Sequence, residues 1–452
     1  MHRVVKDPDG RYDVAILGGG FAGATASRRL TKAGLRVLIV EARDRLAGRM
    51  WSQADYFDGH AVEWGGAFML DRPTYPLTWK EIDAHDLRLE WGSLAKTTLI
   101  WLSGGERRVG PMPVPFDELV SLELLIRRIS ELAARIDPTR PVEDQDVAEL
   151  DVPWPTLLEG LTLGPHTREL FATHVVTLAG DPWEVPSALP LLYSIAASGS
   201  VSAATFFASP YDTPMARTLG PQLADGTGAL HAAVMSESDA DVLLGAKVVS
   251  VDDTGTGVRV STSAGDVTAD AVVCALPIGV LSEVRFTPEL SPELQTLASQ
   301  GVSGQAEKVT VFVSNCPEPF YAHGIPPGGG FATASTTRHE GDRAIVVGFT
   351  SEPGVLDLDD TSAVEKALRQ YVPDITVDAV AWHDWAGDEY ARGTWSYLRP
   401  GQSAIRPAAR RPHGRITFAG SDFDARLGVE GALHTGGLAA DEALGILGRP
   451  TD

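Results

Sequence analysis

The order of apolar and polar residues near the start of the chain predicts a strand, a helix and a second strand. The run from Tyr12 to Leu17 is short and largely apolar, as expected of a buried strand. Ala22, Ala26 and Leu30 then recur four residues apart, which places them on one face of a helix of about three turns. A second apolar run, Leu35 to Val40, predicts the next strand. These segments together predict a βαβ unit.

Three glycines connect the first strand to the helix, and an acidic residue follows the second strand. Gly18, Gly20 and Gly23 have the spacing G-x-G-x-x-G. The first permits a tight turn, the second lets the backbone approach a pyrophosphate, and the third lets the helix pack closely on the strand. Gly34 ends the helix, and Glu41 stands where a carboxylate can accept hydrogen bonds from both hydroxyls of an adenosine ribose. The bare motif is equally compatible with a glycine-rich turn, but the elements around it favour dinucleotide binding.

The pattern changes near residue 87 and again near residue 224. Helical periodicity appears in Glu118–Arg135, a glycine-rich helix start follows at Ala224–Leu230, and Asp239–Asp270 reads as three short strands. The helix start at Ala224–Leu230 resembles a glycine-rich segment of the flavin amine oxidase family. This resemblance implies an α/β fold in which a Rossmann-like nucleotide-binding domain is interrupted by a second, discontinuous α+β substrate domain. The nucleotide-binding domain is expected to comprise residues 1–86, 225–300 and 402–452, and the substrate domain residues 87–224 and 301–401.

Two of the following segments resemble the flavin amine oxidase family. Glu41–Arg49, with the sequence EARDRLAGR, is similar to the family's E-A-R-x-R-x-G-G-R loop, which wraps the adenosine and pyrophosphate of FAD; Ala47 replaces the first glycine of that loop. Ala61–Phe68 resembles the segment whose backbone passes close to the isoalloxazine ring. A side chain at Gly65 or Gly66 would occupy the space of that ring. A simple turn is the alternative for this second segment.

Later segments extend the resemblance and imply which residues contact the cofactor. Ala271–Pro277 resembles a strand that closes over FAD, and a helix beginning near Glu430 would point its positive end toward flavin N1 and the C2 oxygen. The glycines at 328–330 lack the spacing of a second fingerprint, which disfavours a nicotinamide cofactor. The expected FAD contacts are Gly18, Gly20, Phe21, Ala22, Gly23, Glu41, Ala42, Arg43, Gly48, Arg49, Gly65, Gly66, Ala67, Phe68, Val248, Ala275, Pro277, Trp385, Gly420, Ser421, Asp422, Val429, Glu430 and Ala432.

The resemblance also implies two residues that act on the substrate side. Lys308 matches the family lysine that holds a water at flavin N5, although most lysines at strand starts are simply solvated. Trp395 matches one wall of an aromatic cage that aligns the amine. The second wall, commonly tyrosine, aligns with Gly428, so the pocket is wider or that wall comes from elsewhere. Thr394 stands where covalently flavinylated members have a cysteine, and FAD is therefore expected to be non-covalently bound.

The implied activity is FAD-dependent oxidation of an amine to an imine. Water would hydrolyse the imine to a carbonyl compound plus ammonia or an amine, and O2, giving H2O2, or another acceptor would reoxidise the flavin. Two alternatives are a desaturase or carbon-carbon dehydrogenating oxidase on the same scaffold, and a flavin-bearing binding protein without turnover. Tyr193, Phe206 and Phe207 are candidates for the substrate cavity, although plain core is the commoner role of such residues.

Composition excludes several other classes of function. A formal net charge of -22 argues against nucleic acid as a partner, because a phosphate backbone needs a basic face. The chain has no apolar run approaching the about 18 residues of a spanning helix and no signal core, so we expect no membrane anchor and a cytoplasmic location. Cys274, Cys316, His166 and His174 lack metal-ligand spacing, and no metal is expected. The expected partners are a small-molecule amine and an electron acceptor; whether the protein forms a homodimer is left open.

Overall fold

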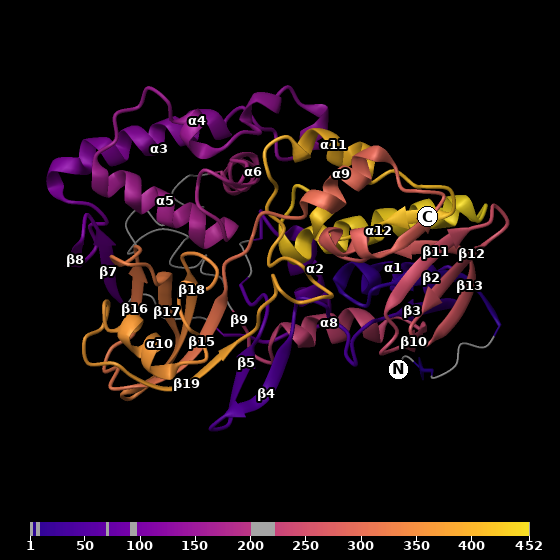
Figure 1. Ribbon diagram of the computed structural model, residues 1–452, viewed down its shortest axis with the longest axis horizontal. Helices are drawn as coiled ribbons and strands as arrows, with labels where there is room; N and C mark the ends of the chain where they lie inside the picture. The colour runs from indigo at the N-terminus through magenta and orange to yellow at the C-terminus, as the bar shows by residue number, and fades with distance from the viewer. Residues whose placement is uncertain (1–2, 6–9, 69–71, 91–96, 200–221, 452) are drawn as a thin grey trace.

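Two large sheets and the helices packed around them form the molecule (Figure 1). The computed structural model describes residues 3–5, 10–68, 72–90, 97–199 and 222–451. One sheet and its helices hold both termini, and the other sheet lies under the helices of the middle of the chain. The predicted α/β fold is therefore confirmed.

The first sheet has nine strands and contains the predicted βαβ unit. Its order is β1-β10-β3-β2-β13-β12-β11-β14, with β20 also pairing with β13. The strands from β1 to β13, and β20, pair in parallel, whereas β11, β12 and β13 form an antiparallel meander. Their bounds are β1 Arg3–Val4, β2 Arg11–Leu17, β3 Val37–Val40, β10 Asp241–Leu243, β11 Val248–Asp253, β12 Val258–Thr262, β13 Gly265–Cys274, β14 Arg285–Thr287 and β20 Ile416–Phe418.

Helices cover both faces of this sheet, which explains why its central strands are apolar throughout. Val14 and Ile16 of β2 pack with one set of helices, and Ala15 and Leu17 face a second core on the other side; all four are fully buried. The helices of this half are α1 Phe21–Lys32, α2 Pro76–Ala84, α8 Thr227–Ser236, α9 Pro292–Gln300, α11 Gln402–Ala409 and α12 Gly428–Ile446.

Two glycines let α1 approach its neighbours closely. A Cβ atom at Gly23 would lie 2.1 Å from the carbonyl oxygen of Gly18, so the third glycine of the fingerprint is required for helix-to-strand packing. A Cβ atom at Gly436 of α12 would lie 2.5 Å from the carbonyl oxygen of Ala22. The two helices therefore pack backbone against backbone, and the N-terminus of α1 is fixed by both contacts.

The second sheet has seven strands in the order β19-β15-β18-β17-β16-β7-β8. Helices α3 to α6 lie above it in Figure 1, and α10 lies against its other side. The strands are β7 Thr98–Ser103, β8 Glu106–Val109, β15 Lys308–Ser314, β16 Phe320–His323, β17 Phe331–Glu340, β18 Arg343–Thr350 and β19 Thr376–Trp382. The helices are α3 Leu119–Ala133, α4 Trp154–Leu157, α5 Pro165–Ala179, α6 Leu189–Ser198 and α10 Thr361–Leu368. Two small sheets pair β4 Ser52–Phe57 with β5 His60–Glu63, and β6 Leu89–Glu90 with β9 Gln222–Leu223.

The sheets divide the chain much as the sequence pattern predicts. Every strand of the nine-stranded sheet falls within 1–86, 225–300 or 402–452, and every strand of the seven-stranded sheet falls within 87–224 or 301–401. The exact domain boundaries remain a prediction. One local prediction was wrong. The sequence predicted that one strand ends at residue 270 and that another begins at residue 271, but the structure has no break there. Gly265–Cys274 is one continuous strand, β13, paired along its length with β2 and β12.

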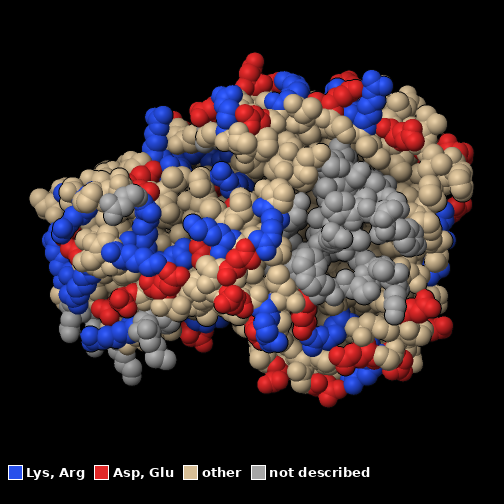
Figure 2. Space-filling model, turned by 180° about the vertical axis from the view of Figure 1, so that it is seen from behind, with Lys and Arg blue, Asp and Glu red and all other residues tan. Residues whose placement is uncertain are grey.

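Acidic and basic side chains are intermixed on the face that Figure 2 shows, despite the net charge of -22. Many charged side chains of the described residues form ion pairs, such as Arg343 with Asp58 at 2.7 Å and Lys247 with Glu389 at 2.9 Å. Within the described part of the chain, the helices are all too short or too polar to cross a bilayer.

Candidate active site

A cavity of about 450 Å³ is lined by residues from both large sheets. The nine-stranded sheet contributes the loops after β2, β3, β13 and β20, which lie at the carboxyl ends of parallel strands. In doubly wound sheets this edge is where nucleotides bind. The seven-stranded sheet contributes Lys308, Tyr321, Thr333 and Phe349 to the opposite wall. We call the part of the cavity that is lined by the loops of the nine-stranded sheet the nucleotide half. The part that is lined by the seven-stranded sheet is called the second half.

The N-terminus of α1 faces this cavity with backbone N–H groups that are not capped by a side chain. Gly20 is the N-cap residue, and the first turn holds no acidic residue. The first N–H groups of a helix lack intrahelical acceptors and carry a partial positive charge. Gly18 has φ of 100°, and a Cβ atom there would lie 2.9 Å from the carbonyl oxygen of Ala275. These features fit a bound pyrophosphate.

Glu41 lies beside this turn and is 6% exposed. Its Oε2 accepts a hydrogen bond from the N–H of Gly19 at 2.8 Å, and its Oε1 accepts one from the N–H of Arg43 at 2.9 Å. Burial raises the pKa of Glu41 above its ordinary value, although these two backbone donors oppose the shift. Each carboxylate oxygen retains a lone pair, so the group fits the hydroxyls of a ribose as well as fixing the loop.

Arg43 lies among aromatic rings at the outer part of the site. Its Nη2 pairs with Asp388 Oδ1 at 2.6 Å, and its guanidinium carbon lies 5.2 Å from the centroid of the Tyr390 ring and 5.6 Å from that of Trp385. His383 Nε2 contacts the other oxygen of Asp388 at 2.8 Å. Burial disfavours the charged form of Asp388, but the bonds from Arg43 and His383 hold its pKa below the ordinary value. The cluster fixes Trp385 in the cavity wall.

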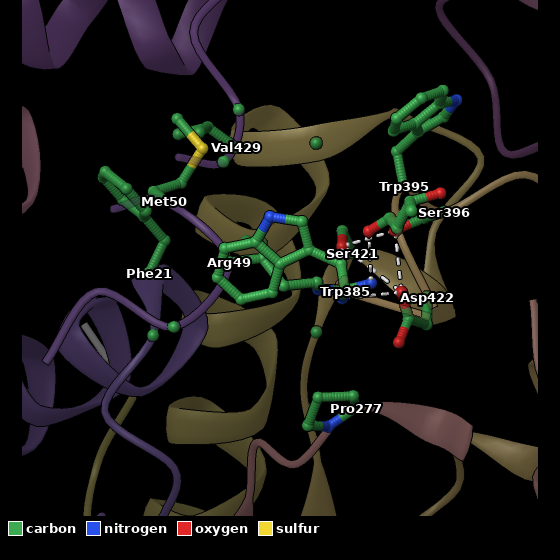
Figure 3. A pocket seen from close by; sticks show the side chains of 18 of the residues that line it. Phe21, Arg49, Met50, Pro277, Trp385, Trp395, Ser396, Ser421, Asp422 and Val429 are labelled. Carbon is green, nitrogen blue, oxygen red and sulfur yellow. Dashed lines mark hydrogen bonds and ion pairs between the residues drawn. The ribbon is translucent and has the colours of Figure 1, made fainter. Parts of the chain in front are cut away.

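Arg49 and Asp422 connect four distant segments at the centre of the site (Figure 3). Asp422 Oδ1 accepts hydrogen bonds from Arg49 Nη2 at 2.9 Å and from Ser396 Oγ at 2.7 Å, while its Oδ2 accepts one from the N–H of Ile278 at 3.0 Å. Arg49 also donates to the carbonyl oxygen of Thr394 at 3.1 Å. Burial raises the pKa of Asp422, but the charge of Arg49 and these donors outweigh it and leave the pKa low. The carboxylate is therefore ionised and paired.

Lys308 lies where the two halves meet, at the start of β15. Its Nζ donates to the carbonyl oxygens of Glu63 at 2.6 Å and Gly65 at 2.7 Å, and the side chain is almost fully buried. Burial lowers the pKa of Lys308 to about 8. An ammonium group has three N–H donors, so these two bonds leave one for the cavity. A Cβ atom at Gly65 would lie 1.8 Å from the carbonyl oxygen of Arg49, and one at Gly66 would lie 2.5 Å from Met50 Sδ. In the structure, both glycines are therefore required by close packing against residues 49 and 50, and not by the space of a ring as the sequence suggested.

Aromatic side chains form the walls beyond Lys308. The rings of Trp395 and Phe349 are nearly perpendicular, at 86°, with centroids 5.7 Å apart. The ring centroid of Phe68 lies 6.0 Å from that of Phe349. Trp395 is held in orientation because its Nε1 donates to the carbonyl oxygen of Leu178 in α5. The predicted cage wall is thus one face of a larger aromatic surface.

Tyr75 lies next to Gly428, the position where the sequence left the second aromatic wall open. A Cβ atom on Gly428 would lie 3.4 Å from the hydroxyl oxygen of Tyr75, and both residues line the cavity. Tyr75 is 8% exposed, and burial together with the nearby Glu430 raises its pKa well above the ordinary value. Gly428 has φ of 61°, which favours glycine at this position. Tyr75, the residue that precedes α2, therefore lies beside Gly428 in the cavity lining.

All but two of the predicted site residues line this cavity, and the two exceptions have clear packing roles. Gly23 provides the close contact of α1 with β2 described above. Glu430 is fully buried, and its carboxylate accepts hydrogen bonds from the N–H groups of Leu77 and Thr78 at 3.0 and 2.9 Å. It therefore caps the N-terminus of α2 instead of facing the cavity. The residues that do line the cavity are Gly18, Gly20, Phe21, Ala22, Glu41, Ala42, Arg43, Gly48, Arg49, Gly65, Gly66, Ala67, Phe68, Val248, Ala275, Pro277, Lys308, Trp385, Trp395, Gly420, Ser421, Asp422, Val429 and Ala432.

Sequence reasoning missed the polar and aromatic residues of the second half. No motif marks four of the lining residues, which are Tyr75 just before α2, Thr177 of α5, and Tyr321 and Thr333 of the seven-stranded sheet. Alternation in β16 and β17 was the one available signal, since it places every second residue on the same face. Of the three candidates proposed for this half, Tyr193 packs in the helical core and donates to the carbonyl oxygen of Pro138 at 3.0 Å. Phe206 and Phe207 lie outside the described residues.

The histidines and acids outside the cavity form local polar networks. His166 Nδ1 contacts Ser103 Oγ at 2.9 Å, and the ring of His174 lies 6.2 Å from that of His323. In the described part of the chain, Glu81, His85 and Glu237 bring three possible metal-ligand atoms within 4.8 Å of one another. Arg28 binds Glu81 at 2.6 Å, and Lys32 pairs with Glu237, so this cluster is an ion-pair network between α1, α2 and α8.

Comparison with known proteins agrees with this geometry. The model of the family described as flavin containing amine oxidoreductase matches residues 21–444. Pseudooxynicotine dehydrogenase of a Pseudomonas species is 29% identical over 94% of this chain and 84% of its own length. (S)-6-hydroxynicotine oxidase of Paenarthrobacter nicotinovorans is 29% identical over 96% of this chain and 99% of its own length.

Solved structures show the same fold. A putrescine oxidase bound to putrescine superposes with a TM-score of 0.80 and 23% identity, covering 98% of this chain and all of that one. Cyclohexylamine oxidase from Brevibacterium oxydans IH-35A has a TM-score of 0.77 and 20% identity over 97% of this chain. The chain belongs to the flavin-containing amine oxidoreductase family. It is an FAD-dependent oxidoreductase that acts on amines, as the sequence motifs predict.

Proposed function

We propose that the protein oxidises a monoamine that carries a ring, and that the ring lies between the aromatic walls of the second half of the cavity. The observation that carries this proposal is the distribution of charge. Of the described carboxylates that line the cavity, Glu41, Glu283 and Asp422 belong to segments of the nucleotide half. The fourth, Glu389, is paired with Lys247 of that half at 2.9 Å. The described lining of the second half offers aromatic rings and hydroxyl groups, so the second ammonium of a diamine would be buried there without a counter-charge.

The names of the most similar relatives support this substrate class. Two of them are named for nicotine derivatives and a third is a nicotine dehydrogenase, 27% identical over 96% of this chain. Nicotine and its derivatives are amines with an aromatic ring. The putrescine oxidase similarity concerns the fold, and its diamine substrate does not suit the described lining of this cavity.

FAD, when bound, accepts the hydride equivalent that leaves the carbon beside the amine nitrogen. The chain's own residues provide position and charge. The N-terminus of α1 and Glu41 hold the nucleotide, and Trp395 and Phe349 orient the ring of the amine. We propose that the remaining N–H of Lys308 holds a water at the junction of the two halves, where it can hydrolyse the imine product. We also propose that FAD is bound non-covalently and that O2 reoxidises it.

An anaerobic comparison of amines tests the substrate class directly. Purified holoenzyme is mixed with equal concentrations of phenethylamine, nicotine, 6-hydroxynicotine and putrescine, and bleaching of the flavin absorbance is timed. We expect at least one ring-bearing amine to reduce the flavin 10-fold or more faster than putrescine, a difference of about 1.4 kcal/mol in transition-state binding. Putrescine reacting as fast as the best ring-bearing amine would contradict the proposal. Bleaching by a polyene and by none of the amines would favour the desaturase alternative.

A further inference from the structure

One row of side chains crosses the seven-stranded sheet from Lys308 into the second half of the cavity. Lys308 pairs with Phe349, Phe349 with Thr333, and Thr333 with His323 across four adjacent strands. Residues directly opposite one another in a sheet point to the same face. Because neighbouring strands are about 4.8 Å apart, Thr333 lies roughly 10 Å from Lys308 along this row. The sheet therefore holds Thr333 at a fixed distance from Lys308, which lies at the junction of the two halves.

A polar cluster lies at the far end of this row. Thr333 Oγ1 lies 3.1 Å from His323 Nδ1 and 2.7 Å from Thr177 Oγ1 of α5. Tyr321, on the same face of β16, places its hydroxyl 3.4 Å from His323 Nδ1. Thr177, Tyr321 and Thr333 line the cavity, whereas His323 is 1% exposed and lies behind them. The cluster is thus one polar part of a wall that also contains aromatic and leucine side chains and the serines Ser194, Ser198 and Ser335.

The directions of these hydrogen bonds follow from the histidine. His323 Nε2 lies 3.1 Å from the carbonyl oxygen of Leu170, which can only accept, so Nε2 carries the proton. Burial lowers the pKa of His323 to about 4, and the ring is neutral at pH 7. Nδ1 is therefore an acceptor, and a hydroxyl proton of Thr333 or Tyr321 points at it.

The threonine protons are consequently directed away from the cavity in either arrangement. If Thr333 donates to His323 Nδ1, the 2.7 Å contact requires Thr177 to donate to Thr333. Alternatively, Thr177 donates to the carbonyl oxygen of Thr173 at 3.0 Å, and Thr333 donates to Thr177. In that case the hydroxyl of Tyr321 donates the hydrogen bond to His323 Nδ1. In both arrangements the threonine protons are used within the cluster, so Thr177 and Thr333 meet a ligand as acceptors. The hydroxyl of Tyr321, which also bonds Thr333, lies beside them in the cavity wall.

We infer that Thr177 and Thr333, oriented by His323, form a specificity subsite that accepts a hydrogen bond from a neutral donor at the far end of the substrate. The donor is a hydroxyl or ring N–H on the side of the aromatic ring opposite the amine, about two strand spacings from Lys308. This inference rests on the proposed function and narrows it: among ring-bearing monoamines, those with a distal donor are preferred. A site built to pair with a substrate hydroxyl discriminates strongly against the analogue that lacks it.

The test compares phenethylamine, tyramine and 4-fluorophenethylamine. Tyramine carries a distal hydroxyl, and the fluoro compound has a substituent of similar size that cannot donate. With parent holoenzyme we expect kcat/KM for tyramine to exceed those for the other two at least 10-fold. In Thr333→Val and Thr177→Val, which keep the side-chain shape, this ratio should fall toward 1. Thr337→Val is the matched control, because Thr337 belongs to the same strand, lies outside the cavity, and bonds the carbonyl oxygen of Ile345.

Binding provides an independent readout of the same preference. The visible spectrum of bound flavin changes when a ligand occupies the site, so dissociation constants can be measured even for an amine that is not turned over. A preference for tyramine in binding but without flavin reduction would count against the proposed oxidation and support the subsite. A parent enzyme without preference for tyramine over both analogues, or a preference that survives in both threonine variants, would overturn the subsite.

Discussion

Glu41 and Lys308 show how one buried ionisable side chain can serve both the fold and the site. Glu41 holds the loop after β3 through two backbone N–H groups, and Lys308 ties the segment around Gly65 to β15 through two carbonyl oxygens. Glu41 could be predicted from the sequence because it follows an apolar strand, and Lys308 because it matches a family lysine at the start of one. Their backbone partners could not, because these depend on loops that approach from elsewhere in the chain.

Replacing Glu41 by Gln should weaken FAD binding by about 1 to 3 kcal/mol, because a charge-assisted acceptor is lost while the side chain keeps its size. The dissociation constant is measured by titrating apoprotein with FAD. Asp44→Asn, an exposed acid in the same loop, is the control and should change affinity little. An unchanged affinity in Glu41→Gln would show that Glu41 only braces the loop.

Replacing Lys308 by Met should leave a folded protein that still binds FAD, with a loss in stability of about 1 to 3 kcal/mol from the two carbonyl groups left unpaired. Flavin reduction and reoxidation should slow by roughly 10 to 1000-fold, since a positioned donor and its charge are removed. Reoxidation is expected to suffer more, because positive charge stabilises electron transfer to oxygen. Rapid mixing measures both steps, with Lys366→Met on the surface as control; rates equal to the parent's in both steps would mean that Lys308 merely braces the fold.

The lowered pKa of Lys308 predicts a pH dependence in the same step. Burial lowers this pKa to about 8, so the ammonium is charged below pH 8 and neutral above it. If its charge assists reoxidation, the rate in the parent should fall as pH rises through about 8. The rate in Lys308→Met should lack this decline, and a decline of equal size in both proteins would assign it to another group.

At the scale of elements, the sequence predicts which segments surround the nucleotide but not how they are joined. The start of α12 was placed correctly to within a few residues, since a glycine-rich run after an apolar strand marks it. Glu430 in its first turn was expected to serve the cofactor, yet it caps α2, more than 350 residues earlier in the chain. Likewise, Tyr75 lies beside Gly428 only because α2 and α12 pack together, and neither element carries a signal for that contact.

The cap of α2 by Glu430 should contribute measurably to stability. Glu430→Gln leaves one acceptor oxygen for the N–H groups of Leu77 and Thr78, so we expect a loss of about 1 to 3 kcal/mol in the free energy of unfolding. Chemical denaturation of FAD-loaded protein measures it. Asp441→Asn on the same helix removes an ion pair that is about one-third exposed and should cost less than about 1 kcal/mol. Equal losses in the two variants would contradict the capping role.

At the scale of the whole molecule, the site exists only where the two sheets meet. The nucleotide half could be predicted almost completely, because its motifs are local in sequence. The second half depends on the order β15-β18-β17-β16-β7, which is not the order of the chain and brings Lys308, Thr333 and His323 into one row. Because residues of both halves line the cavity, FAD binding should stabilise the entire fold.

Non-covalent FAD should therefore be both removable and stabilising. Thr394 offers no thiol, and burial raises the pKa of Cys274 to about 12 and that of Cys316 to about 11, so neither cysteine is a ready nucleophile. We expect a yellow protein with one FAD per chain that acid precipitation releases intact. Adding FAD back to apoprotein at about 100 times its dissociation constant should raise the free energy of unfolding by about 2.7 kcal/mol, seen as a higher Tm. Flavin that stays with the precipitated chain would contradict non-covalent binding. A Tm that is independent of FAD would mean that the two halves do not depend on the cofactor for their association.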